Sequence, residues 1–339
     1  MHWTDPVISP NDIRPGRRCP PDYGYAPRVF TRAAELHADI LYVAGGIYGN
    51  LPALLEIERM AAHETGSAMI VFNGDQHWFD AEPASCIAVE RAVRRHIALR
   101  GNVETEAAAD DTANGCGCAY PESVPDDDVE RSNQILLRLR AAVSAAEALS
   151  PGLRRQLAAL PMHRVAQVGD ARIGIVHGDA WALAGWRFAH DALHAADANT
   201  LQGAFEQAAV DVFTSSHTCL PALRLLDTAA GERVVVNNGA AGMPNFRGER
   251  AGLVTRIAVE PVPAALAGVR RYGTEAVGVY IDALAVCYDA AMWDAQFTRL
   301  WPDGSAADLS YRRRIIDGPQ FTVDDALGRS GRASCLASG

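Results

Sequence analysis

The stretch Ala68–Asp80, AMIVFNGDQHWFD, constrains the fold more than any other part of this chain. Its apolar run MIVF is typical of a short strand that is buried on both faces. Asn73-Gly74 then predicts a turn, so Asp75 lies at the carboxyl end of the strand. Open α/β sheets bind their ligands at this end, because the loops that leave the strands converge there. The sequence therefore indicates an α/β protein with Asp75 at its functional edge.

Polar side chains follow other predicted strands in the same way. These residues are Asn102, His177, His217 and Asn238. One carboxylate, one amide oxygen and two imidazoles suit a borderline divalent ion such as Mn, Fe or Zn, whereas Ca and Mg prefer ligands that are all oxygen. Any one of these residues alone is more often an ordinary turn or surface group, so the prediction of a metal site depends on their joint placement.

The 339 residues, 49% of them hydrophobic, are enough for one large domain. We expect an N-terminal arm at 1–30, the domain at 31–320 and a C-terminal tail of small residues at 321–339. Within the domain, residues 103–128 form a predicted acidic loop with a Cys-Gly-Cys centre, and loops of this length are often functional. Helices are predicted at 51–60, 86–99, 129–149, 151–160, 183–209 and 290–300, and strands at 39–44, 69–72, 163–168, 172–176, 210–214, 234–236, 253–259 and 277–286.

The net charge of −10 opposes binding to nucleic acid and to anionic membranes, so a small-molecule partner is expected. No apolar run is long enough to span a bilayer, and the N-terminal residues lack the apolar centre of a signal peptide, which predicts a cytoplasmic protein. Seven cysteines in a chain of this size favour free thiols over a disulfide framework. The sequence does not decide the oligomeric state, and a homo-oligomer is compatible with it.

The order of these polar residues and the short motifs that contain them resemble the calcineurin-like metallophosphoesterase family over the range 41–259. Asp75 in Gly-Asp matches the metal-bridging aspartate, and Asn102 in Gly-Asn matches the asparagine ligand. His177 in His-Gly and His217 in Ser-His-Thr match two histidine ligands. The resemblance implies a four-layer α/β/β/α sandwich of two mixed β-sheets, with the metal site at one rim.

The chain also departs from the family pattern. The family opens with Asp-x-His, where this chain has Gly46 and Tyr48, and the last histidine of Gly-His-Thr-His is Cys219 here. The histidine that protonates the leaving group in the family is Val103. The resemblance therefore implies that the first metal site is lost, while the second, formed by the four matched residues, is retained and holds one ion per chain.

Other residues are candidates to replace the lost groups. Cys219, Cys116 and Cys118 are soft ligands for a further metal site, although buried packing of small cysteines is the preferred interpretation. His77 is a candidate acid or substrate contact, and its alternative is a loop side chain near the rim. The ring of Tyr48 either fills the space of the first metal, which is the safer interpretation, or binds substrate or metal.

The principal hypothesis is a metal-dependent hydrolase that acts on a small phosphate ester or a related small molecule. A single metal can still act as a Lewis acid and activate a water, although the missing acid lowers the rate for poor leaving groups. One alternative is a non-catalytic binding or regulatory relative that retains the metal. The other is an iron enzyme in which cysteines help to hold the metal and the chemistry is not hydrolysis.

Overall fold

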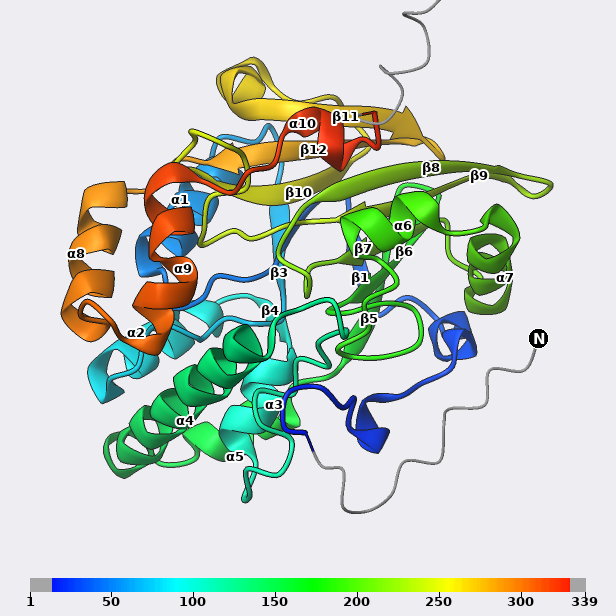
Figure 1. Cartoon of the computed structure of the whole chain (residues 1–339). Coiled ribbons are helices and arrows are strands. Elements are labelled where there is room, and N and C mark those ends of the chain that lie inside the picture. The colour runs from blue at the N-terminus through cyan, green and yellow to red at the C-terminus, as the bar shows by residue number, and fades with distance from the viewer. Residues whose placement is uncertain (1–13, 330–339) are drawn as a thin grey trace, which may run out of the picture.

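The structure, a computed structural model, describes residues 14–329, and within this range two mixed six-stranded sheets lie face to face (Figure 1). The first sheet contains, in order across it, β1 (Leu36–Ala38), β5 (His163–Val168), β6 (Ala171–Val176), β7 (Val212–Ser215), β9 (Gly231–Asn237) and β8 (Ala222–Thr228). The second contains β11 (Arg270–Ala276), β12 (Val279–Val286), β10 (Gly252–Ala258), β2 (Ile40–Ala44), β3 (Ala68–Asn73) and β4 (Ile97–Leu99).

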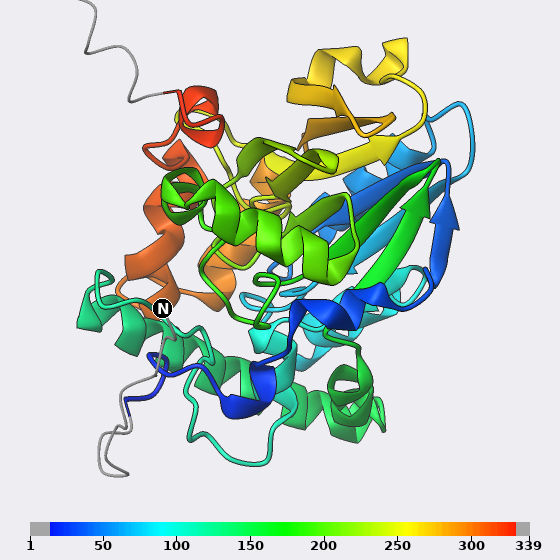
Figure 2. The ribbon, with the colours of Figure 1, turned by 90° about the vertical axis from the view of Figure 1, so that its right-hand side faces the viewer.

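Helices cover the outer face of each sheet, as Figures 1 and 2 show. The second sheet is covered by α1 (Leu51–Ala61), α2 (Pro83–Val93), α3 (Asn102–Ala108), α4 (Asp126–Leu149), α5 (Leu153–Ala159), α8 (Ala290–Leu300) and α9 (Ala306–Asp317). The first sheet is covered by η2 (Pro27–Thr31), α6 (His190–Ala195) and α7 (Ala198–Ala208). No helix within residues 14–329 combines the length and apolar character needed to cross a membrane.

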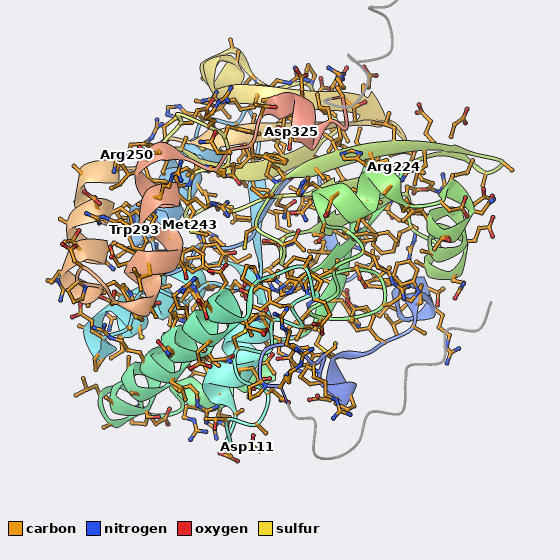
Figure 3. The ribbon with its side chains drawn as sticks, viewed as in Figure 1. Asp111, Arg224, Met243, Arg250, Trp293 and Asp325 are labelled. Carbon is orange, nitrogen blue, oxygen red and sulfur yellow. A yellow bond between two sulfur atoms is a disulfide. The ribbon has the colours of Figure 1, made fainter. Side chains whose placement is uncertain are left out.

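The alternation of side chains along the central strands produces separate cores. In β2, Leu41 and Val43 pack between the two sheets, whereas Tyr42 and Ala44 pack under the helices, because successive side chains of a strand point to opposite faces. The core under the helices also contains Trp293 of α8 and Met243 (Figure 3). Helices, sheet, sheet and helices make four layers, so the predicted α/β/β/α sandwich is confirmed.

Several predicted boundaries need correction. The segment 86–99 is not one helix, because α2 ends at Val93 and the last three residues form the strand β4. The acidic loop predicted at 103–128 is shorter, since α3 continues to Ala108 and α4 begins at Asp126. A helical face of α3 buries Glu104 and Glu106, which the charge pattern alone places in solvent.

The two terminal segments are partly built into the fold. The described part of the predicted arm packs through Tyr23 and Phe30, both buried. The predicted tail begins with the buried Phe321 and the short helix α10 (Val323–Ala326). The remainder of both predictions, at 1–13 and 330–339, lies outside the described residues.

A buried ion pair fastens the end of α1 to the second sheet. The Glu64 carboxylate accepts hydrogen bonds from Arg256 Nε at 2.7 Å and Nη2 at 3.1 Å, and from the Tyr42 hydroxyl at 2.6 Å. The side chains of Glu64 and Arg256 are 0% and 1% exposed, and the only other carboxylate near Arg256 among the described residues is that of Asp282, at 3.7 Å, so removing Glu64 leaves a buried charge poorly paired.

We expect Glu64→Ala to lower the free energy of unfolding by about 3–5 kcal/mol, because the buried Arg256 then loses its hydrogen-bonded carboxylate and keeps only Asp282, at 3.7 Å. Urea denaturation measures this difference. The control is Glu122→Ala, which removes an exposed ion pair with Arg14 and should cost less than about 1 kcal/mol. Equal effects of the two substitutions would contradict the assignment of Glu64 as a buried anchor.

Candidate metal centre

Two pairs of parallel strands, one pair in each sheet, bring the predicted ligands to the same edge. β3 and β4 are parallel neighbours in the second sheet, and β6 and β7 are parallel neighbours in the first. Asp75, Asn102, His177 and His217 follow these four strands at their carboxyl ends. All four side chains are buried, with at most 6% of any residue exposed.

The donor atoms of these residues gather around one imidazole nitrogen. His177 Nε2 lies 3.1 Å from Asn102 Oδ1, 3.1 Å from His217 Nδ1 and 3.3 Å from Asp75 Oδ1. Adjacent ligands of an ion with bonds of 2.0–2.2 Å are roughly 2.8–3.6 Å apart in tetrahedral or octahedral geometry. His177 Nε2 therefore lies at ligand-to-ligand spacing from the other three donor atoms, and Asp75, His177 and His217 offer atoms that all lie within 4.8 Å of one another.

Backbone carbonyls turn both imidazoles so that their lone pairs face each other. His177 Nδ1 lies 3.0 Å from the Asn73 carbonyl, and His217 Nε2 lies 2.9 Å from the Cys118 carbonyl, so each of these nitrogens carries a hydrogen and donates it. The other two nitrogens then meet at 3.1 Å as acceptors. Such a contact is favourable only with a proton or a cation between the rings, which fits a metal site.

The pKa shifts of the two rings have different causes. Burial lowers the pKa of His177, but the carboxylates of Asp75 and Glu104 outweigh burial and raise it above its ordinary value. Burial and the neighbouring His177 lower the pKa of His217 to about 4, so this ring is neutral near pH 7. A neutral imidazole is the form that binds a metal.

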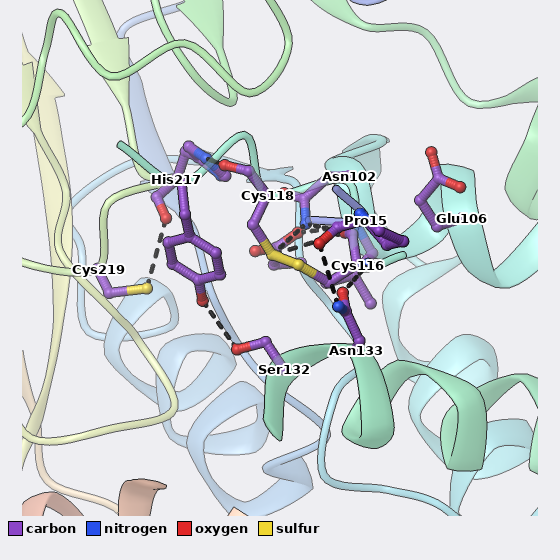
Figure 4. The surroundings of a disulfide bond; sticks show 12 residues. Pro15, Asn102, Glu106, Cys116, Cys118, Ser132, Asn133, His217 and Cys219 are labelled. Carbon is purple, nitrogen blue, oxygen red and sulfur yellow. Dashed lines mark hydrogen bonds between the residues drawn. A yellow bond between two sulfur atoms is a disulfide. The ribbon is translucent and has the colours of Figure 1, made fainter. Parts of the chain in front are cut away.

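A disulfide loop orients two of the four side chains (Figure 4). Cys116 and Cys118 form a disulfide across Gly117, with Cα atoms 5.3 Å apart. This corrects the expectation of free thiols for these two cysteines, because a tight turn at Gly117, with φ of +64°, brings them within bonding range, whereas Cys86, Cys219 and Cys287 are free. The Asn102 Nδ2 donates to the Cys116 carbonyl at 2.9 Å, which leaves its Oδ1 aimed at His177, while the Cys118 carbonyl holds His217.

Glu104 fixes the backbone around Asp75. Its buried carboxylate accepts hydrogen bonds from the backbone N–H groups of Asp75, Gln76 and Gly101 at 2.8 Å each, and from that of His77 at 3.3 Å. Asp75 has a φ of +56°, an uncommon conformation for a residue with a side chain. Glu104 is not among the residues predicted from the sequence, although a glutamate three residues after Gly101, at the start of a helix, is a capping signal.

Tyr48 lies beside two other positions that depart from the family pattern, Gly46 and Cys219. The Tyr48 hydroxyl lies 2.8 Å from Cys219 Sγ, and a Cβ on Gly46 would lie 2.4 Å from the Tyr48 ring. Tyr48 therefore occupies the space beside Gly46. Burial raises the pKa of both the Tyr48 hydroxyl and the Cys219 thiol, which keeps both groups neutral near pH 7.

The structure does not bring His77 to this site. Its imidazole is fully buried, with Nδ1 2.6 Å from Asp80 Oδ2 and Nε2 3.6 Å from Glu90 Oε2. Burial lowers the pKa of His77, but the two carboxylates outweigh burial and raise it well above its ordinary value. His77 is thus the cation of a buried ion triad and is neither a loop side chain at the rim nor a group that faces the pocket. His77, Asp80 and Cys86 are also close enough to hold a metal.

A pocket of about 190 Å³ opens beside the candidate ligands. Pockets that bind drug-sized ligands have volumes of about 300–1,000 Å³, so this pocket suits a smaller molecule. Its lining residues are Tyr48, Asp75, Trp78, Asn102, Val103, Cys118, Tyr120, Trp186, His217, Thr218, Cys219, Tyr311 and Arg314.

The sequence matches no family model and no curated protein, whereas solved structures resemble this one. A hypothetical protein from Pyrococcus horikoshii OT3 has a TM-score of 0.55 and 17% sequence identity, over 83% of this chain and 99% of that chain. A metallophosphoesterase from Sphaerobacter thermophilus has a TM-score of 0.49 and 16% identity, over 83% of this chain and 100% of that chain. The chain thus shares its overall fold with the first of these structures.

We expect Glu104→Gln to weaken the binding of a divalent ion about 10- to 100-fold, because Glu104 holds the loop of Asp75 without touching the ion position itself. Competition with a chelating dye measures the affinity. Glu130→Gln, on the exposed face of α4, is the control and should change nothing. An unchanged affinity in Glu104→Gln would mean that other contacts set the position of Asp75.

Proposed function

We propose that the protein is a metal-dependent hydrolase of small phosphate esters, with one divalent transition-metal ion held by Asp75, Asn102, His177 and His217. The observation that carries this proposal is the convergence of three donor atoms on His177 Nε2 at 3.1–3.3 Å. The donor set of two nitrogens and two oxygens suits Mn, Fe or Zn. Such an ion polarises a phosphoryl oxygen and lowers the pKa of a bound water.

The protein's own groups prepare the site for this chemistry. In the neutral rings, the carbonyls of Asn73 and Cys118 place the hydrogens on the other nitrogens, which leaves lone pairs on His177 Nε2 and His217 Nδ1, and Glu104 fixes Asp75 through its backbone. Burial of all four side chains excludes most water, which strengthens their interaction with a charged group. Val103 stands where the family has its proton donor, and its side chain has no proton to give. Esters with good leaving groups are therefore the preferred substrates.

A single ion is favoured over two. Tyr48 fills the space beside Gly46 and is hydrogen-bonded to Cys219, so the three positions hold no carboxylate or imidazole for a second ion. The Cys116–Cys118 disulfide also removes two thiolates from the set of soft ligands. This argues against the iron enzyme in which those cysteines bind metal.

Metal content and turnover of p-nitrophenyl phosphate test the proposal together. The purified protein should contain close to one equivalent of Mn, Fe or Zn and hydrolyse the ester. The variant Asp75→Asn should lose the ion, and its rate of ester hydrolysis should fall at least about 100-fold, because the substitution removes the only carboxylate among the proposed ligands.

Asp303→Asn, an exposed aspartate far along the chain, serves as the matched control and should keep both properties. If Asp75→Asn retained the metal and the activity, the assigned site would be refuted. Bound metal without turnover of any ester in a panel would instead favour the non-catalytic relative.

The single-ion proposal has its own test. Gly46→Asp together with Tyr48→His restores two ligand types and removes the ring that a Cβ at position 46 would meet, so the metal stoichiometry should rise above that of the wild type. Asp tolerates the φ of +59° at this position better than most residues. Metal analysis of the double variant, with Tyr48→Phe as control, measures the change; an unaltered stoichiometry would mean that Cys219 or its backbone also blocks the first site.

A further inference from the structure

The pocket beside the candidate ligands contains a single cationic side chain among its lining residues, Arg314. It comes from α9, which lies outside the part of the chain that carries the metallophosphoesterase motifs. Arg314 Nε donates to the Pro244 carbonyl at 3.0 Å and Nη2 donates to the Cys219 carbonyl at 2.7 Å. These bonds hold the guanidinium in place, while Nη1 has no hydrogen-bond partner among residues 14–329.

Five aromatic side chains also line the pocket, namely Tyr48, Trp78, Tyr120, Trp186 and Tyr311. Tyr120 packs against Trp186 with centroids 5.7 Å apart, and Trp186 packs on the ligand His217 at 5.4 Å. The Trp186 indole also donates to the Cys118 carbonyl at 2.9 Å. Tyr311, one turn before Arg314 on α9, packs edge to face on Phe79 at 5.0 Å. These contacts fix the rings before any ligand enters, which lowers the entropic cost of binding.

We propose that Arg314 binds the phosphoryl group of the substrate and that the substrate is a small phosphate monoester with a planar aromatic group. This inference rests on the proposed function, because it places the phosphoryl group between Arg314 and the ion. A divalent ion beside the Asp75 carboxylate leaves one net positive charge in the pocket, and Arg314 supplies a second. Two positive charges match a monoester, whose charge at pH 7 is about −1.5 to −2, better than a singly charged diester.

The shape of the pocket agrees with this substrate class. A guanidinium presents parallel donors to phosphate oxygens, and its fixed orientation here means that little side-chain entropy is lost on binding. The volume of about 190 Å³ leaves room for a small ester only. An aromatic leaving group also departs without a proton donor, which fits the presence of Val103 where the family has its acid.

Binding of two phosphonates that cannot be hydrolysed tests the proposal. Phenylphosphonate and methylphosphonate are titrated by calorimetry into protein loaded with Zn, and the bound metal is measured in the same samples. Arg314→Gln should weaken both about 10- to 100-fold, as expected for the loss of a charge-assisted hydrogen bond. Arg313→Gln, the exposed neighbour on the same helix, should bind like the wild type. Arg314→Lys keeps the charge but not the planar guanidinium, so its affinity for the phosphonates should lie between those of the wild type and Arg314→Gln.

Tyr311→Leu tests the aromatic part, and it should reduce the preference for phenylphosphonate over methylphosphonate at an unchanged metal content. The wild type should prefer phenylphosphonate. Wild-type affinities in Arg314→Gln with metal bound would overturn the role of Arg314, and equal binding of the two phosphonates by the wild type would overturn the aromatic class. In both cases the metal centre would stand. A wild-type protein that binds no Zn would overturn the proposed function itself and this inference with it.

Discussion

The site depends on the hydrogen bonds of Asn73, which join the ends of the two sheets. Its Nδ2 donates to the Val176 carbonyl at 2.8 Å, its backbone carbonyl accepts from His177, and its Oδ1 accepts from Asn238 at 3.2 Å. Asn73 ends β3 in one sheet, while Val176 and Asn237 end strands of the other. Because a buried polar group is costly to leave without a partner, these bonds hold the two carboxyl edges together. The four candidate ligands can meet only because the edges do.

Asp75, His177 and His217 could be proposed as ligands from sequence because each follows a predicted strand within a few residues, whereas the strand before Asn102 was not predicted. Asp75 and His177 lie within two residues of a strand end, so the strand pattern and the ligand position come from the same short segment. The layers were predictable for a similar reason, since buried strands and amphipathic helices carry strong local patterns. The resemblance of the motifs to a known family also indicated the order in which the ligand residues appear along the chain. A metal-binding arrangement of distant residues is therefore accessible from sequence when every ligand is tied to a regular element.

Features that depend on contacts between segments were not predictable. Glu104 and Glu106 look like members of an acidic loop until α3 turns them inward. The strand β4 has only three residues and follows a helix of similar composition, so periodicity could not separate them. The enclosure of His77, a loop residue, depends on Glu90 of the helix α2. The disulfide between Cys116 and Cys118 likewise depends on the geometry of the turn between them, which cannot be deduced from the composition of the chain.

Helix α9 forms one wall of the pocket, yet it lies about ninety residues after the last candidate ligand, His217. A chain leaves the ribosome from its N-terminus, so all four ligands emerge before Tyr311 and Arg314 do. The ion position and the substrate wall thus come from different stages of synthesis, and the wall is the last to be added. Because α9 carries none of the four candidate ligands, substitutions on its pocket side can alter what the pocket would accept without replacing a side chain that would hold the metal.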